Sequence, residues 1–292
     1  MINIKTWIGF ALSFVVCLYL IQTIQVHDVL LALRQLKVSY LIIALVFDFL
    51  CIISKSQLWR ALIEIYSKMS RQYAFRLYVM GLAMNSILPF RMGDLGKSMF
   101  LAKDRNVHFR DALTSVLAEG GLQIAAIILL ATVIVFLEPN PLLENSLLLV
   151  SGSLFVGMLI LLGFKKLDYA FLKIPHISLK FSMMGWSVLS LVFYILSVMY
   201  TLKSCGIILP YLASILLIVF LTLSAVIPAA PGRLGTFEAT VLLVLTWFKV
   251  PFSQAIGFAL VLHLVQTIPI CIYGASFFVT LPRFNANQNR CR

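Results

Sequence analysis

Two short segments of the chain place an arginine among glycines. Residues 89–96 and residues 228–235 share the pattern proline-x-x-x-glycine-x-leucine-glycine, with Arg91 inside the first copy and Arg233 inside the second. Glycine lets a backbone N–H group approach a ligand without a side chain in the way. A helix that begins after such a segment adds free N–H groups and the positive end of its dipole. The two segments therefore predict a binding site for an anion, with a phosphate group as the expected ligand.

The two arginines also have structural alternatives, which the sequence leaves open. A long basic side chain can lie along apolar surface and reach the membrane interface, and either arginine could neutralise Asp94 or Glu238. The residues expected to bind the substrate belong to both segments and to the carboxylate between them: Arg91, Gly93, Asp94, Gly96, Lys97, Glu119, Gly232, Arg233, Gly235, Thr236 and Glu238.

Further polar residues lie inside apolar stretches of the sequence. An ionisable group at the centre of a membrane costs at least about 2.5 kcal/mol unless it is paired or hydrated, which makes it a functional candidate. Arg76, Arg91 and Arg233 are the expected partners of the carboxylates. His263 and Gln266 lie one turn apart, although a histidine that only packs is the alternative. The residues predicted to line the same cavity are Asp48, Asn85, Gln123, His263 and Gln266.

The sequence contains no motif for nucleotide binding, metal binding or hydrolysis. Gly96, Lys97 and Ser98 imitate the end of a nucleotide-binding P-loop, but the required glycine five positions earlier is Arg91. The five cysteines are widely spaced, and no histidine and cysteine cluster or hydrolase motif is present. We therefore predict no metal, no cofactor and no nucleotide.

The composition is that of a membrane protein. Of the 292 residues, 61% are hydrophobic and 12% are charged, against about 45–50% and 25% in soluble domains, and the mean hydropathy is +1.01. Apolar residues on this scale leave no room for a separate soluble domain, so we expect one integral membrane domain over residues 1–292. The net charge of +12 is then read as loop charge that sets topology, not as a nucleic-acid surface.

The apolar runs predict an all-α protein that crosses the membrane several times. A bilayer span needs about 20 residues. The six predicted full spans are residues 7–24, 38–53, 112–137, 142–163, 183–202 and 254–281. Residues 55–71 are basic and amphipathic, so this stretch is expected to lie along the membrane surface.

Two apolar runs are too short to cross. Residues 77–88 end at Pro89, and residues 236–248 follow the second glycine-containing break. We expect each to belong to a re-entrant helical hairpin, the second formed from residues 209–248. This topology puts 17 lysines and arginines on the cytoplasmic side and four outside, as the positive-inside rule requires. Both termini are then cytoplasmic.

The two glycine-containing segments, residues 89–96 and 228–235, interrupt the predicted helices and are called the first and second break. They are related as an internal repeat. The second copy begins 139 positions after the first, and the predicted hairpins enter from opposite sides. Paired broken helices of opposite orientation are typical of transporters with inverted repeats, which bind substrate near the middle of the bilayer. The repeated halves are residues 72–137 and 205–281, followed by a tail over residues 282–292.

The same segments carry a family resemblance. Residues 85–94, and residues 228–238 with their ending glycine-threonine-phenylalanine-glutamate, resemble two hallmark segments of the lysylphosphatidylglycerol synthase transmembrane, or flippase-like, family. The resemblance implies a stand-alone membrane domain that moves a lipid; the aminoacyl-transferring domain is not seen, so lipid aminoacylation is not implied. Asp94 and Lys97 stand where the family commonly has glutamate and arginine, and Gly120 where it has arginine. The charge pairing in the site is therefore expected to differ.

The sequence thus favours a transporter over an enzyme. We expect a lipid flippase that moves an anionic phospholipid or a polyprenyl-phosphate-linked lipid across the inner (plasma) membrane of a prokaryote. One alternative is an integral-membrane lipid or glycosyl transferase, in which the charged groups would bind phosphate and supply a general base. The other is a non-catalytic scaffold for a lipid-modifying enzyme. The expected partners are membrane lipids, with no nucleic acid.

Overall fold

The computed structural model describes residues 34–88, 91–137, 181–225 and 230–288. Within these ranges every regular element is helical, which confirms the all-α prediction. The elements are α3 (Val38–Ile63), α4 (Arg71–Ile87), α5 (Met92–Arg105), α6 (Phe109–Leu137), α8 (Phe181–Ser204), α9 (Tyr211–Ser224), the short 3-10 helix η2 (Pro231–Arg233), α10 (Thr236–Trp247) and α11 (Phe252–Gln288). The predicted spans 7–24 and 142–163, and the two prolines that open the breaks, lie outside the described residues.

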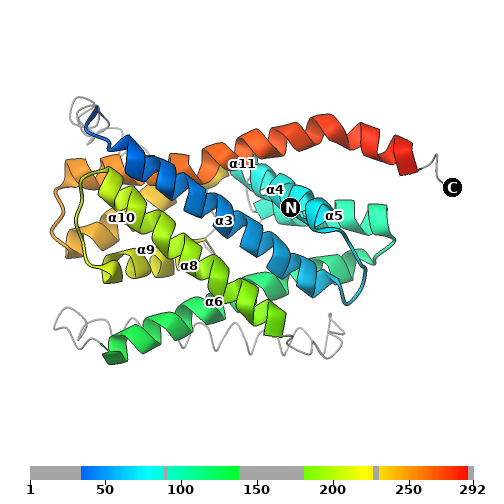
Figure 1. Cartoon of the computed structure of the whole chain (residues 1–292), viewed down its shortest axis with the longest axis horizontal. Helices are drawn as coiled ribbons and strands as arrows, with labels where there is room; N and C mark the ends of the chain where they lie inside the picture. The colour runs from blue at the N-terminus through cyan, green and yellow to red at the C-terminus, as the bar shows by residue number, and fades with distance from the viewer. Residues whose placement is uncertain (1–33, 89–90, 138–180, 226–229, 289–292) are drawn as a thin grey trace, which may run out of the picture.

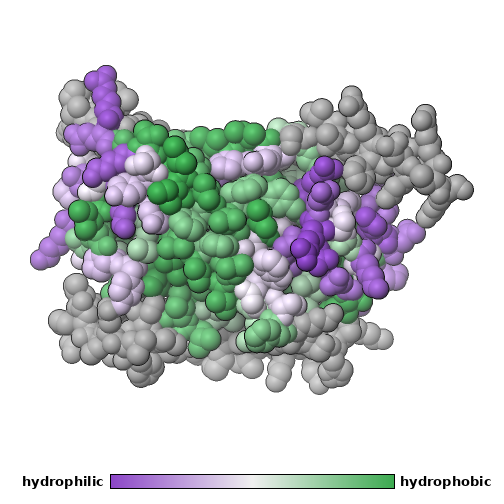
Figure 2. All heavy atoms as spheres, viewed as in Figure 1, coloured by the Kyte–Doolittle hydropathy of each residue, from purple (hydrophilic) through white to green (hydrophobic). Residues whose placement is uncertain are grey.

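Three helices of the described part are long and apolar enough to cross a membrane: α3, α8 and α11 over its first 24 residues. Each exposes an apolar stripe at helical spacing, as with Val38, Ile42 and Val46 on α3. Figure 2 shows the result, an apolar belt between two polar ends of the molecule. A soluble protein would bury such stripes, so the chain is a multi-pass membrane protein.

Helix α3 continues beyond its predicted end. Residues 55–71 were expected along the membrane surface, but α3 runs on to Ile63 and buries Trp59 and Leu62. The surface prediction for this stretch is therefore wrong up to Ile63. At 1.5 Å per residue, its 26 residues measure about 39 Å, enough for a tilted crossing. Helices α3 and α8 lie side by side (Figure 1).

Helices α4 and α5, the first helix pair, are antiparallel and in close contact. Gly93 of α5 lies against Gly81 and Asn85 of α4, and Lys97, one turn further, reaches back to Gly81. Ser70 begins α4 earlier than the predicted arm 77–88, because its hydroxyl accepts a hydrogen bond from the N–H of Tyr73 at 3.2 Å.

Helices α9 and α10, the second helix pair, surround the second break. They contain 14 and 12 residues, and α10 begins at the predicted residue. Along the long axis of the molecule the two helix pairs lie towards opposite ends (Figure 1). Their breaks nevertheless meet, because η2 packs on α4, with Gly232 beside the carbonyl of Ser86.

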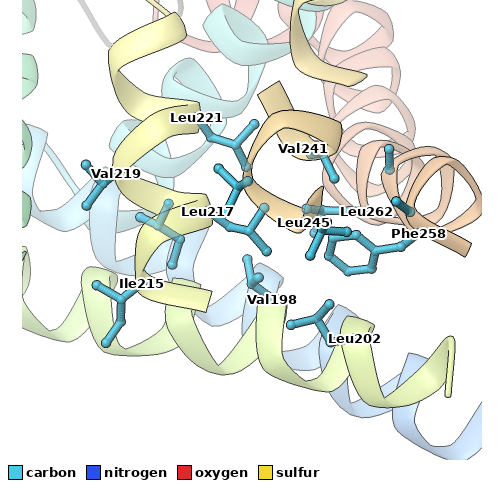
Figure 3. Packing of buried hydrophobic residues seen from close by; sticks show 14 of the residues in the cluster. Val198, Leu202, Ile215, Leu217, Val219, Leu221, Val241, Leu245, Phe258 and Leu262 are labelled. Atoms are coloured by element: carbon cyan, nitrogen blue, oxygen red, sulfur yellow. The ribbon is translucent and has the colours of Figure 1, made fainter. Parts of the chain in front are cut away.

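Two apolar clusters anchor the helix pairs. The larger one joins α8, α9, α10 and α11 around Leu217, Leu245 and Phe258 (Figure 3). The smaller one joins α3, α4, α5 and α6 around Trp59 and Leu77. Helix α11 serves both pairs, since its N-terminal half packs on α10 while Gly274 lies against Ala83 of α4.

Candidate functional site

A cavity of about 510 Å³ lies where the two breaks meet. Its size is in the range of small-molecule sites, and every described α-helix contributes to its wall. The polar and charged lining residues are Asp48, Lys55, Tyr78, Asn85, Ser86, Arg91, Asp94, Lys97, Glu119, Gln123, Tyr194, Thr222, Arg233, His263, Gln266 and Thr267.

The structure brings most of the predicted site residues to this cavity. Those of the substrate-binding set that line it are Arg91, Asp94, Lys97, Glu119, Gly232 and Arg233, and all five residues predicted to line a cavity do so: Asp48, Asn85, Gln123, His263 and Gln266. The remaining predicted residues, Gly93, Gly96, Gly235, Thr236 and Glu238, are not in the lining. Gly93 and Gly96 lie against α4 instead.

Lys97 and Glu119 form a buried ion pair in the cavity wall. The Nζ atom of Lys97 lies 3.5 Å from Glu119 Oε2 and over the rings of Trp59 and Tyr78, at 4.5 and 4.4 Å from their centroids. The Tyr78 hydroxyl donates to Glu119 Oε1 at 2.5 Å. The cation beside Glu119 is thus a lysine, and the expectation of an arginine partner is wrong for this carboxylate.

Arg91 lies at the start of α5 and at the edge of the cavity. Its Nε is 2.9 Å from Asp94 Oδ2, and 61% of its side chain is exposed. Asn85 supports the same carboxylate, since its Nδ2 donates to Asp94 Oδ1 at 3.2 Å. Arg91 therefore neutralises Asp94, as the structural alternative expected, while remaining accessible from the opening.

Arg233 closes the end of α9. Its Nη2 donates to the carbonyl of Leu221 at 2.8 Å and to the hydroxyl of Ser224 at 2.7 Å. A cation at a helix C-terminus also interacts favourably with the helix dipole. Both break arginines have left-handed backbones, with φ of 53° at Arg91 and 61° at Arg233. Such strain in residues other than glycine is concentrated at functional sites.

Glu238 joins the second break to α11. Its Oε1 lies 2.6 Å from Nδ1 of His263, and its Oε2 accepts the N–H of Gly235 at 2.7 Å. The carboxylate therefore caps the helix to which it belongs and holds it against the last span. It also occupies one of the backbone donors that were expected to face an anion.

Lys55, Tyr78 and Tyr194 line the cavity but were not predicted from the sequence. Lys55 had been assigned to the membrane surface, yet it lies seven residues after Asp48, which is two helical turns. That spacing on an apolar helix was the available signal, since it puts both charges on one face. Nothing in the sequence singles out Tyr194.

One known family matches most of the chain. The family described as Lysylphosphatidylglycerol synthase TM region matches residues 6–274. The match includes both breaks and every residue that lines the cavity. No curated protein matches the chain.

Proposed function

The chain belongs to the lysylphosphatidylglycerol synthase transmembrane-region family, and from this premise we propose that it is a flippase for an anionic phospholipid or a polyprenyl-phosphate-linked lipid. One observation carries the proposal. Charged groups from both broken segments converge on a cavity of about 510 Å³, between helices whose outer faces are apolar. A polar head group can occupy such a space while its acyl chains stay in the bilayer.

The proposed architecture has six full spans and two re-entrant hairpins in one domain over residues 1–292. The helices beside the breaks support it, because α4, α5, α9 and α10 have 17, 14, 14 and 12 residues, fewer than the roughly 20 that a crossing needs. An inverted repeat of residues 72–137 and 205–281 is supported by the matching left-handed arginines and by the positions of the helix pairs (Figure 1).

The proposed transport cycle is alternating access around the breaks. Arg91, at the opening, meets the phosphate first, and the polar wall then replaces the hydration shell of the head group. Because α9 and α10 are joined through Arg233 and α10 is joined to α11 through Glu238, the second helix pair moves with its neighbours. Tilting of one pair against the other then changes the side on which the cavity opens.

We place the protein in the inner (plasma) membrane of a prokaryote with both termini in the cytoplasm, and this topology is testable at Lys103. This residue is exposed on α5 and falls in the predicted cytoplasmic loop. In a variant without native cysteines, Lys103→Cys should react with a membrane-impermeant maleimide only in inverted vesicles. Lys203→Cys, exposed at the end of α8, should react in intact cells. Labelling of Lys103→Cys from outside would disprove the re-entrant first hairpin.

Reconstitution tests the transport function. In sealed vesicles, the purified protein should move fluorescent phosphatidylglycerol between leaflets at least ten times faster than protein-free vesicles do, and faster than it moves fluorescent phosphatidylcholine. A transferase would instead convert a lipid in detergent, where no second compartment exists. A scaffold would do neither and would copurify with an enzyme. Equal rates with and without protein would rule out the flippase.

A further inference from the structure

Two charged residues of the cavity, Asp48 and Lys55, form no ion pair within the described part of the chain. Asp48 and Lys55 lie on α3 and both line the cavity. Asp48 is 5% exposed, and among the described residues its Oδ2 has no hydrogen-bond partner. The Nζ atom of Lys55 lies 4.9 Å from the centroid of the Tyr194 ring and beside the thiol of Cys51. The carboxylates of Glu119 and Asp48 act on it only from beyond 4.0 Å.

Two other cations of the cavity are engaged in ion pairs, Arg91 with Asp94 and Lys97 with Glu119. An anion that bound to either would have to compete with a carboxylate. Arg233 forms no ion pair among the described residues and its Nε has no hydrogen-bond partner there, but its Nη2 is used to hold the end of α9. Lys55 has no carboxylate within 4.0 Å among the described residues, so binding there breaks no ion pair.

The other carboxylates are engaged in the same way. Asp94 and Glu119 have the cations just named, and Glu238 has His263 and the N–H of Gly235. Asp48 is the remaining carboxylate in the described wall of the cavity. Two turns separate it from Lys55, a distance of about 10 Å along the helix, so the two residues do not neutralise each other by direct contact.

A buried charge without a partner is costly, and a ligand that satisfies two such charges gains affinity from both. We propose that Lys55 binds the phosphate of the lipid head group and that Asp48 accepts a hydrogen bond from an amine or hydroxyl group of the same head group. This inference rests on the proposed function. The ring of Tyr194 holds the ammonium by a cation–π contact, and Gln266 fixes that ring by donating to the tyrosine hydroxyl at 3.3 Å.

Three synthetic lipids distinguish the contact of Lys55 with the phosphate from the hydrogen bond to Asp48. Phosphatidylglycerol offers phosphate and hydroxyl groups, phosphatidylethanolamine offers phosphate and an amine, and phosphatidylmethanol offers phosphate alone. Native mass spectrometry of the full chain in detergent, titrated with each dioleoyl lipid, measures retention. Lys55→Gln should weaken all three by about ten- to a hundred-fold, the range for a charge-assisted hydrogen bond. Asp48→Leu should weaken the binding of phosphatidylglycerol and phosphatidylethanolamine but leave the binding of phosphatidylmethanol unchanged.

Lys203 supplies a matched control for this experiment. Its Nζ also lies over a tyrosine ring, 5.2 Å from the centroid of Tyr200, but the residue is exposed and outside the cavity. Lys203→Gln should leave retention of all three lipids unchanged, and Lys55→Arg should restore most of what Lys55→Gln loses. If Lys55→Gln fails to fold, the double variant Asp48→Leu with Lys55→Leu replaces it, because that variant buries no single charge.

The outcomes separate this inference from the proposed function. Wild-type retention in Lys55→Gln, or in the folded double variant, would overturn the role of Lys55 while the vesicle assay could still uphold the flippase. Equal losses for all three lipids in Asp48→Leu would overturn the role of Asp48. If the wild-type protein retained none of the lipids and moved none in vesicles, both would fail.

Discussion

Replacing Lys97 with leucine is expected to lower the free energy of unfolding by about 3–5 kcal/mol, the usual loss when one partner of a buried ion pair is removed. The two side chains are 3% and 8% exposed, so solvent compensates little for the loss of the lysine beside Glu119. The double variant Lys97→Leu with Glu119→Leu should recover most of the loss, because it leaves no lone charge. The midpoint of thermal unfolding in detergent, followed by fluorescence-detected size exclusion, measures both.

Lys103 provides the control on the same helix. It is exposed, so Lys103→Leu should change the free energy of unfolding by less than about 0.5 kcal/mol. If the double variant were as unstable as Lys97→Leu alone, the loss would come from the contacts of the ammonium group with the rings of Trp59 and Tyr78. The interpretation of the pair as a charge-compensated unit would then be wrong.

Replacing Gly93 with alanine is expected to destabilise the protein by on the order of 3 kcal/mol, at the upper end of overpacking effects. An added Cβ would lie 2.6 Å from the backbone nitrogen of Asn85. Backbone cannot move aside as a flexible side chain can, so α5 would have to separate from α4. The same thermal measurement, together with the yield of folded protein, records the effect.

Gly185 of α8 is the matched control, since nothing lies within 4 Å of an added Cβ there. Gly185→Ala should be neutral or should stabilise by up to about 1 kcal/mol, because alanine is the better helix former. A Gly93→Ala protein as stable as the wild type would mean that α4 and α5 do not touch in the membrane.

The breaks were predictable because their signals are local. Proline and glycine disrupt helices wherever they occur, so the start of α10 at Thr236 could be read from four neighbouring residues. The all-α, multi-pass architecture followed from composition, since a chain of this hydropathy in lipid must satisfy its backbone within helices or closed barrels. Neither inference needs knowledge of which helices touch.

The position of Lys55 could not be predicted in the same way. Two serines flank it and suggest a polar surface, but each satisfies its hydroxyl within α3, Ser54 on the carbonyl of Leu50 and Ser56 on that of Ile53. A polar helix face can meet either water or an internal cavity. The choice depends on neighbouring helices, which a pattern along one helix does not reveal.

The partners of the buried charges were unpredictable for a related reason. Glu119 could have met any cation that the fold brought near, and the sequence offered three arginines. Its partner is Lys97 because contact through Gly81 and Gly93 brings α5 close to α4, beneath the ring of Tyr78. Pairing is decided by tertiary contacts that no single segment encodes.

Helix α11 contacts the two helix pairs at different points along its axis, so a movement of one pair against the other must bend it. It is bound to α10 at His263 and lies against α4 at Gly274, eleven residues or about 16 Å apart along its axis. Pro269 falls between these points and has no N–H to donate to Val265, so bending costs least there. A change in the angle between the helix pairs would therefore bend α11 at Pro269, while its contacts with α10 and α4 are kept.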